Sequence, residues 1–597
     1  MKPANAGKRQ GRANRNAAGL LCAVVAVAAQ ASQTSAQSLP QFKVTAEVSV
    51  AGGGVPGPGK LVSVKLVYAD PATGKPSRQP VRPAGFFRVA GDGQGDCATA
   101  VRAYSLNRGM HSGATSLTGS LIVTSNADGT LSFVDPLSNL ASANIFELVQ
   151  LGAPAVMTTV FQGGIASLMP DGGILLTDAG GETRKAETGS DKVLTIGTAG
   201  PALWAAGADV LAGFDGEGKR LFSAKIAGGI RAVAVLGNDH AAPAAPDRLA
   251  VLDGAGAVRF VSPYDGSDMG ATLSVAASLM DGNATAVAAA AQGQAIRLMW
   301  PGNAEGVSID AGFRADGLKV DRLGLFAFAW QGREGLLIDL ARGRIADRIA
   351  LAAEPHEALF SGRSLFLNHK ADGGLTLIDT GPLQNGTGKA AVRVYTIDAR
   401  EAGPTPMAVH DPEKGFVIAM PRGLSSANVY GNGNPTAPIT TTPLRGARAL
   451  TIALLDRSFR PSGPGTFETV GRLPLKGPVE LVTLTDDYKT IKCFPVRSSA
   501  PLPDKAPVLL VTTPQDAAAG KTFTALLRIQ DDATGITSTL EALPLTVRDI
   551  QGNSLAIEAR RRGDVFAFEL KVNSPGQYPV TAELPGFSSP GLIEVLP

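Results

Sequence analysis

One pattern recurs along the middle of this 597-residue chain: an apolar run, a Gly-containing turn and a second apolar run that often ends in Asp. Examples are SLIVTSNADGTLSFVDP, which begins at Ser120, and SLFLNHKADGGLTLIDT, which begins at Ser364. Most copies are about 41 to 50 residues apart, a spacing typical of repeats that each supply one supersecondary unit. Such a unit buries its faces only against its neighbours, so the copies must pack on one another.

Repeats of this length, each with a hairpin, predict a β-propeller over residues 117–446 and an all-β fold class. The region holds about 330 residues, which at about 45 per blade gives seven blades, with eight as the alternative. A faint further unit near Ile296–Ile309 leaves the count open. A β-solenoid is the rival architecture, but solenoid repeats are usually shorter.

Two stretches that flank the repeat region resemble each other. GKLVSVKLVYADPATG from Gly59 aligns without a gap with GKTFTALLRIQDDATG from Gly520, and both alternate as half-buried strands do. A second gap-free pair begins at Gly465 and Asp564, and each member reads as a strand, a Pro/Gly turn and a strand. These patterns are typical of an immunoglobulin-like β-sandwich.

The two copies differ in the distance between their signatures. In the later copy both fall within residues 505–597, which is the size of one sandwich. In the earlier copy the repeat region separates them. We therefore expect a propeller inserted into a sandwich made of residues 40–116 and 447–500, because a domain whose termini lie close together fits into a loop. Two unrelated partial modules are the alternative.

The first 36 residues have the order of a secretory signal peptide: a basic segment, the apolar stretch Ala17–Ala31 and small residues. A retained anchor is the alternative. This segment holds five basic and no acidic residues, so its removal lowers the formal net charge from +3 to −2. A chain with so small a net charge gives no electrostatic reason to expect nucleic-acid binding. We expect a periplasmic or secreted protein without a membrane span in the mature chain.

Two cysteines, Cys97 and Cys493, lie outside the predicted signal peptide. We expect them to form a disulfide across the neck of the inserted propeller, because an oxidising compartment favours the bond. Cys97 precedes the propeller, and Cys493 lies in the expected final strand of the split sandwich. Two separately buried thiols are the alternative. Two distant cysteines cannot form the Cys-x-x-Cys-His motif of a c-type heme.

No motif predicts a catalytic residue, a metal site or a cofactor. The histidines have no ligand-like spacing, and we interpret them as surface or turn residues, with His111 the one nearest the propeller entry. They are His111, His240, His356, His369 and His410. The Asp-Gly pairs suit tight turns better than calcium loops. They begin at Asp92, Asp128, Asp171, Asp215, Asp253, Asp265, Asp281, Asp316 and Asp372. Trp204, Trp300 and Trp330 are expected in blade cores rather than in a carbohydrate site.

The stretch IVTSNADGTLSFVDPL, which begins at Ile122, resembles the YVTN-type repeat of secreted bacterial β-propellers. That group is similar to the propeller of heme d1 nitrite reductases. The resemblance covers roughly residues 117–446, without the heme signature. It implies a periplasmic accessory or binding protein with a protein partner, such as a periplasmic cytochrome or another redox protein.

The function expected from the sequence is therefore that of a non-catalytic binding or scaffold protein, with no cofactor. One alternative is a propeller enzyme, lactonase-like or a quinoprotein-like oxidoreductase, with its site at the channel mouth. Another is a cell-surface structural or adhesive protein. Converging acidic, His or Asn side chains in the channel would favour the enzyme.

Overall fold

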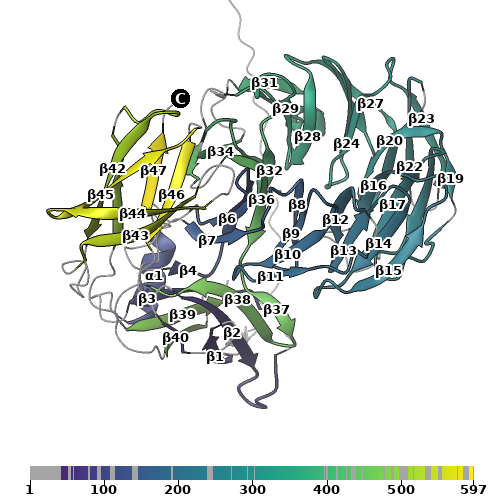
Figure 1. Ribbon diagram of the computed structural model, residues 1–597. Coiled ribbons are helices and arrows are strands. Elements are labelled where there is room, and N and C mark those ends of the chain that lie inside the picture. Colours follow the sequence, from purple (N-terminus) through teal and green to yellow (C-terminus); the bar gives the residue numbers. More distant parts are fainter. Residues whose placement is uncertain are drawn as a thin grey trace, which may run out of the picture. The chain divides into compact units, whose positions relative to one another are not determined.

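The computed structural model describes residues 42–595 with internal gaps. The longer gaps are 51–54, 90–95, 108–114, 137–144, 238–246, 432–437, 486–489, 497–507, 531–539, 549–553 and 583–590. Strands dominate the described residues, which include two helices, α1 (Cys97–Asn107) and α2 (Gly381–Gln384) (Figure 1). In this part of the chain, no helix has the length and apolar character needed to cross a membrane.

Eight four-stranded antiparallel sheets follow one another through the repeat region of the described chain. The first sheet takes its first strand from the end of the region: β36 (Ala449–Asp456), β5 (Ser120–Asn126), β6 (Thr130–Val134) and β7 (Ile145–Gln150). The second sheet consists of β8 (Met157–Phe161), β9 (Gly164–Leu168), β10 (Ile174–Asp178) and β11 (Thr183–Lys185). The third consists of β12 (Thr195–Ala199), β13 (Ala202–Ala206), β14 (Val210–Phe214) and β15 (Arg220–Lys225). The fourth consists of β16 (Ile230–Leu236), β17 (Arg248–Asp253), β18 (Ala257–Val261) and β19 (Leu273–Ser274).

The remaining four sheets continue the same order. They are β20 (Ala277–Gly282), β21 (Val287–Ala291), β22 (Ala295–Trp300) and β23 (Asn303–Asp310); β24 (Gly317–Val320), β25 (Phe326–Gln331), β26 (Glu334–Asp339) and β27 (Arg344–Ala350); β28 (Pro355–Ser361), β29 (Ser364–His369), β30 (Leu375–Asp379) and β31 (Ala391–Tyr395); and β32 (Met407–Asp411), β33 (Phe416–Ala419), β34 (Ser426–Tyr430) and β35 (Thr440–Pro443).

The sheets form a closed ring. The first strand of each sheet, here called its innermost strand, contacts the innermost strand of the next sheet, and β32 contacts β36, which in turn contacts β8. Because β36 pairs with β5, strands from both ends of the region close the ring (Figure 1). This topology fits a β-propeller. The repeat length favours seven units with eight as the alternative, and the described residues form eight sheets.

Apolar side chains between neighbouring sheets form the core of the ring. One cluster joins Leu168 of β9 to Leu203 and Phe214 of the following sheet. Two tryptophans on second strands are buried over glycines of the adjacent innermost strands: Trp204 faces Gly197, and Trp330 faces Gly317. The interpretation of these tryptophans as core residues is therefore confirmed, and Trp300 is half-buried against a similar cluster.

Segments from both sides of the ring share a two-layered structure, here called the first sandwich. One layer has the order β1 (Lys43–Ser49), β2 (Leu61–Ala69), β38 (Thr466–Arg472) and β37 (Arg460–Gly463). The other has the order β4 (Thr115–Ser116), β3 (Pro83–Val89), β39 (Val479–Thr485) and β40 (Ile491–Val496). A single apolar core joins the layers and includes Leu66, Phe87 and Leu481. In Figure 1 the purple strands β1–β3 lie among the green strands β37–β40.

The C-terminal strands form a seven-stranded antiparallel sheet with an apolar core of its own. Its order is β41 (Val508–Thr512), β42 (Thr522–Gln530), β45 (Val565–Lys571), β44 (Ser554–Arg562), β43 (Ala542–Arg548), β46 (Gly576–Ala582) and β47 (Gly591–Val595). The two strands at the ends of this order also contact each other. The sheet therefore curls round its core.

Candidate functional site

The antiparallel order of each sheet divides the loops of the ring between two ends. The turn between the second and third strands lies at the same end as the loop that leads to the next sheet. On the sheets β8–β11 and β12–β15, this end is formed by residues 151–157, 169–173, 185–188 and 192–195, which we call the pocket face. It is the end at which the innermost strands β8 and β12 begin.

The opposite end of the ring, at the sheet β8–β11 and at the sheet of β36, β5, β6 and β7, is in contact with the first sandwich and the segment that leads into it. Arg457, which follows β36, forms a buried ion pair with Asp135, with 2.7 Å between Nη2 and Oδ2. Arg460 of β37 packs over Gly163 in the turn between β8 and β9. The guanidinium of Arg457 also lies 5.4 Å from the ring centroid of Phe146. These contacts leave the pocket face on the other side of the ring from the first sandwich.

A pocket of about 340 Å³ opens on the pocket face. Its apolar lining comes from the loop before β8, the turn between β9 and β10 and the chain after β11. These residues are Leu151, Ala153, Met169, Pro170, Ile174, Leu175 and Ala186. Two charged side chains, Asp171 and Lys185, complete the lining together with Thr188 and two glycines. The pocket is thus an apolar hollow that carries one anionic and one cationic group.

Three large apolar side chains are exposed next to this pocket. Val156 is 60% exposed, Met157 36% and Leu194 55%. The Val156 backbone N–H donates to the carbonyl of Leu168, the residue before the pocket-lining turn, at 2.8 Å. The hydroxyl of Thr195 donates to the Met157 sulfur at 3.7 Å and so links the starts of β8 and β12. These contacts bring the exposed apolar side chains at the starts of β8 and β12 close to the turn that lines the pocket.

A second group of polar side chains lies on four successive innermost strands. Their charges alternate in the order Arg231, Asp281, Lys319 and Glu357. Lys319 Nζ lies 3.2 Å from Asp281 Oδ2, which also accepts the Val320 backbone N–H at 2.9 Å. Arg231 donates to the Ala277 carbonyl at 3.2 Å. We call Asp281, Lys319 and Glu357 the charged arc.

Glu357 is the member of the charged arc that takes part in no ion pair among the described residues. Its side chain is exposed and keeps contact with water. The protein that surrounds the carboxylate nevertheless raises its pKa by removing part of its hydration, and the positive charge of Lys319 opposes that rise. The arc therefore combines an ion pair with a carboxyl that takes up a proton more readily than an ordinary Glu.

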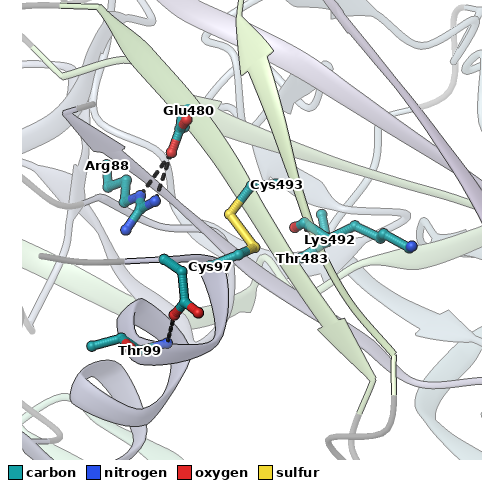
Figure 2. Close-up of a disulfide and its surroundings, with 8 residues drawn as sticks. Arg88, Cys97, Thr99, Glu480, Thr483, Lys492 and Cys493 are labelled. Carbon is teal, nitrogen blue, oxygen red and sulfur yellow. Dashed lines mark hydrogen bonds and ion pairs between the residues drawn. A yellow bond between two sulfur atoms is a disulfide. The ribbon is translucent and has the colours of Figure 1, made fainter. Parts of the chain in front are cut away.

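The disulfide expected between Cys97 and Cys493 is present, with 5.9 Å between the Cα atoms (Figure 2). Cys97 is the first residue of α1, and Cys493 lies in β40. Helix α1 begins after Asp96, whose carboxylate accepts the Thr99 backbone N–H at 2.8 Å. The bond therefore ties α1, on the chain that leads into the ring, to a strand that follows the ring.

The structure places three of the five histidines, and one differs from expectation. His111 and His240 lie outside the described residues, as does the side chain of His410. His356 is exposed on β28. The interpretation as a surface or turn residue is wrong for His369, which ends strand β29 and is 3% exposed. A tight turn folds over its ring, so that Nδ1 lies 2.9 Å from Asp372 Oδ1 and Nε2 2.8 Å from Thr376 Oγ1.

Most of the Asp-Gly pairs that the structure describes act as turns. The carboxylates of six accept the backbone N–H two residues later, as tight turns require: Asp128, Asp171, Asp215, Asp253, Asp265 and Asp372. Two described pairs differ. Asp281 lies within β20 and pairs with Lys319, and Asp316 directly precedes β24 and accepts the Gly332 backbone N–H. Across the described ranges, no group of three His, Cys, Asp or Glu side chains has the arrangement of a metal site.

Sequence reasoning missed the charged arc and the pocket. The innermost strands precede the recognisable hairpins, and neither Lys319 nor Glu357 belongs to a turn motif, so these two residues did not stand out. The pocket combines three separate loops, and no short motif encodes that arrangement. A usable signal was the pair of apolar residues Val156-Met157 just before a predicted hairpin, where a solvent-facing loop would normally be polar.

Comparisons with known proteins add little to this description. No protein-family model matches the chain, and no curated protein matches it. Among solved structures, Sqt1 of Saccharomyces cerevisiae is 12% identical, with a TM-score of 0.39, over 53% of this chain and 93% of that one. AztD of Citrobacter koseri is 11% identical, with a TM-score of 0.32, over 69% and 98%. Hydrazine synthase of Kuenenia stuttgartiensis is 14% identical, with a TM-score of 0.31, over 50% and 94%. We base no functional argument on likenesses this distant.

Proposed function

We propose that this chain is an exported binding or scaffold protein that engages a protein partner through its pocket face. The observation that carries the proposal is the exposure of Val156, Met157 and Leu194 beside an apolar pocket. Contiguous apolar surface left in water is unfavourable, and it commonly marks a protein interaction site. A partner that covers these side chains would remove their apolar surface from water, and this burial would favour binding.

The position of the first sandwich supports the same face. The end opposite the pocket face is occupied in two sheets. Arg457 pairs with Asp135 in the sheet of β36, β5, β6 and β7, and Arg460 packs over Gly163 in the sheet β8–β11. A partner on the pocket face would not compete with those contacts. The first sandwich would then act as a base, and the ring would present its free end.

The proposal includes an architecture and a location. The eight sheets count as eight blades of a propeller inserted into an immunoglobulin-like sandwich. The sequence puts the propeller at residues 117–446 and the sandwich at residues 40–116 and 447–500, and the later boundary moves to the end of β36, because β36 (Ala449–Asp456) pairs with β5 in the ring. A second sandwich covers residues 505–597. Residues 1–36 would direct export to the periplasm or beyond the cell, where a disulfide is stable. A periplasmic cytochrome or another redox protein is the partner class that the YVTN-type resemblance implies.

A substitution experiment on the full exported chain tests the binding face. Native cells expressing the tagged protein are cross-linked, and proteins bound to the wild type are identified and compared with those bound to the double variant Val156→Ser/Leu194→Ser. Leu555→Ser is the matched control, because Leu555 is 48% exposed on β44 of the C-terminal sheet, outside the ring. We expect the control to keep the partner and the double variant to lose it. Retention by a correctly folded double variant contradicts the proposal.

The charged arc supports a second candidate, a propeller enzyme with its site inside the ring. Asp281, Lys319 and Glu357 converge from three successive innermost strands, and Glu357 has the raised pKa of a potential proton donor. Hydrolysis of simple lactones and dye-linked oxidation of alcohols would test it. Turnover that Glu357→Gln abolishes, with the fold intact, would favour the enzyme over the binding protein.

A further inference from the structure

The pocket on the pocket face has the size of a site for a small molecule. Its volume of about 340 Å³ lies near the lower end of the range for ligand sites. Three of the apolar lining residues, Met169, Ile174 and Ala186, are buried, and backbone hydrogen bonds hold Met169 to Gly173 and Ala186 to Ile174. A ligand with a side chain of leucine size would therefore meet a preformed apolar floor, and much larger molecules would protrude.

Two opposite charges lie in the wall of this pocket. Asp171 uses Oδ1 to accept the Gly173 backbone N–H at 2.9 Å, which fixes the turn and leaves its other oxygen available. Lys185 is the last residue of β11. Within the described chain, neither side chain is part of an ion pair, although both line the same hollow. A free ammonium and a free carboxylate are the groups that would complement them.

The next sheet provides an internal comparison. Asp209 lies in the turn between the second and third strands, as Asp171 does, and Lys225 ends the fourth strand, as Lys185 does. In that sheet the two charges satisfy each other, with 3.6 Å between Lys225 Nζ and Asp209 Oδ2. In the sheet β8–β11 the corresponding charges stay apart, with the pocket opening beside them. The two neighbouring sheets thus differ in whether these two charges pair with each other.

We propose that this pocket binds an apolar α-amino acid in its zwitterionic form. The aliphatic side chain would lie on Met169 and Ile174, the ammonium group would face Asp171 and the carboxylate would face Lys185. The inference goes beyond the proposed function, because it assigns a small-molecule site to the surface next to the partner area. Both charges on the ligand are needed to match both charges on the pocket.

Titration calorimetry on the full chain with four leucine derivatives tests the proposal. L-leucine carries both charges, N-acetyl-L-leucine only the carboxylate, L-leucinamide only the ammonium, and N-acetyl-L-leucinamide neither. We expect L-leucine to bind most tightly, and loss of either charge to weaken binding about two- to fivefold, as is typical of exposed ion pairs. Equal binding of N-acetyl-L-leucinamide overturns the proposal and identifies a subsite for a residue within a peptide. Absence of binding to L-leucine at about 10 mM, well above a millimolar Kd, also overturns it.

Single substitutions assign each charge to its residue. Asp171→Asn keeps the oxygen that caps the turn and should remove the preference for L-leucine over N-acetyl-L-leucine. Lys185→Gln should remove the preference for L-leucine over L-leucinamide. Lys225→Gln, the matched control, should leave both preferences unchanged. If either pocket variant keeps the wild-type preferences, the assignment is wrong. A negative result for leucine binding does not decide the proposal of a protein partner, because Val156 and Leu194, which test that proposal, do not line the pocket.

Discussion

Leu61 lies opposite Arg472 in the first sandwich, and Thr522 lies opposite Lys571 in the C-terminal sheet. The gap-free alignments of the two repeated stretches superimpose the first pair on the second. The duplicated module therefore has the same strand pair in the same register in both copies. In the first copy this register survives although the whole ring lies between the two strands. The pairing explains how one module can occur twice with a large insertion in only one copy.

The disulfide between Cys97 and Cys493 should stabilise the first sandwich. It closes a loop of 396 residues, for which chain entropy gives an upper value of about 6 kcal/mol. The pairings of β2 with β38 and of β3 with β39 already hold the loop ends together in the folded state. We expect Cys97→Ser/Cys493→Ser to lower the free energy of unfolding by about 2–4 kcal/mol in denaturant titrations. Peptide mapping without reductant should recover the linked pair, and two free thiols in that map would contradict the bond.

The ion pair of Arg457 with Asp135 should be needed to hold the first sandwich on the ring. Both side chains are buried, and removal of one leaves an uncompensated charge. We expect Arg457→Ala to lower the free energy of unfolding by about 3–5 kcal/mol. Arg528, which pairs with Asp564 in exposed surroundings, is the control, and Arg528→Ala should stay close to the wild type. Equal effects of the two variants would show that the buried pair has no special role.

Asp321 should make the protein more stable as the pH falls from 6 towards 4. Burial raises its pKa from 3.8 to about 6, so the folded state binds this proton more tightly than the unfolded state. At neutral pH the ionised carboxylate is therefore unfavourable in the fold. We expect Asp321→Asn to raise the free energy of unfolding at pH 8 by about 1–3 kcal/mol, and to do so much less at pH 4.

A control carboxyl has a shift of the opposite sign. The backbone N–H of Thr73 lowers the pKa of Asp70, so its ionised form is the favoured one in the fold. Asp70→Asn should therefore give no gain in stability at pH 8. Urea titrations of both variants at pH 4 and pH 8 measure the difference. An Asp321→Asn variant with no gain at pH 8 would show that this carboxyl is hydrated in solution.

Gly317 should not tolerate a side chain. A Cβ at this position would lie 1.9 Å from Cζ2 of Trp330, whose ring is held between two sheets. We expect Gly317→Ala to lower the free energy of unfolding by about 1–3 kcal/mol, the usual range for overpacking a core. A Cβ added at Gly388 would meet no atom within 4 Å, so Gly388→Ala should change stability by less than about 0.5 kcal/mol. Thermal unfolding of the two variants provides the comparison.

Much of the fold could be predicted because hairpins leave local signals. The units at Ser120 and Ser364 combine alternating apolar residues with a turn whose Asp caps it, and both form the expected second and third strands. The number of sheets was harder to predict. The sheet β20–β23 has an Ala-rich second strand and no Asp-Gly in its hairpin turn, so its repeat signal is faint.

The candidate site was less predictable, because it depends on contacts between repeats. Lys319 and Asp281 come from neighbouring innermost strands, and their approach depends on the register of whole sheets within the ring. Asp281 precedes a glycine and therefore has the sequence of a turn, although β20 runs through it. Likewise, nothing local distinguishes Lys185 from Lys225, and only the structure shows that one forms an ion pair with the turn carboxylate.

The measurement that tests the central claim most directly is hydrogen exchange of the cross-linked or co-purified complex against the free chain. If a partner binds the pocket face, backbone amides in residues 151–157, 169–173 and 192–195 should gain protection. Residues 460–472 of the first sandwich, which contact the opposite end of the ring, should exchange as in the free chain. Protection confined to the first sandwich or to the C-terminal sheet, with residues 151–157 unchanged, would contradict the proposed binding face.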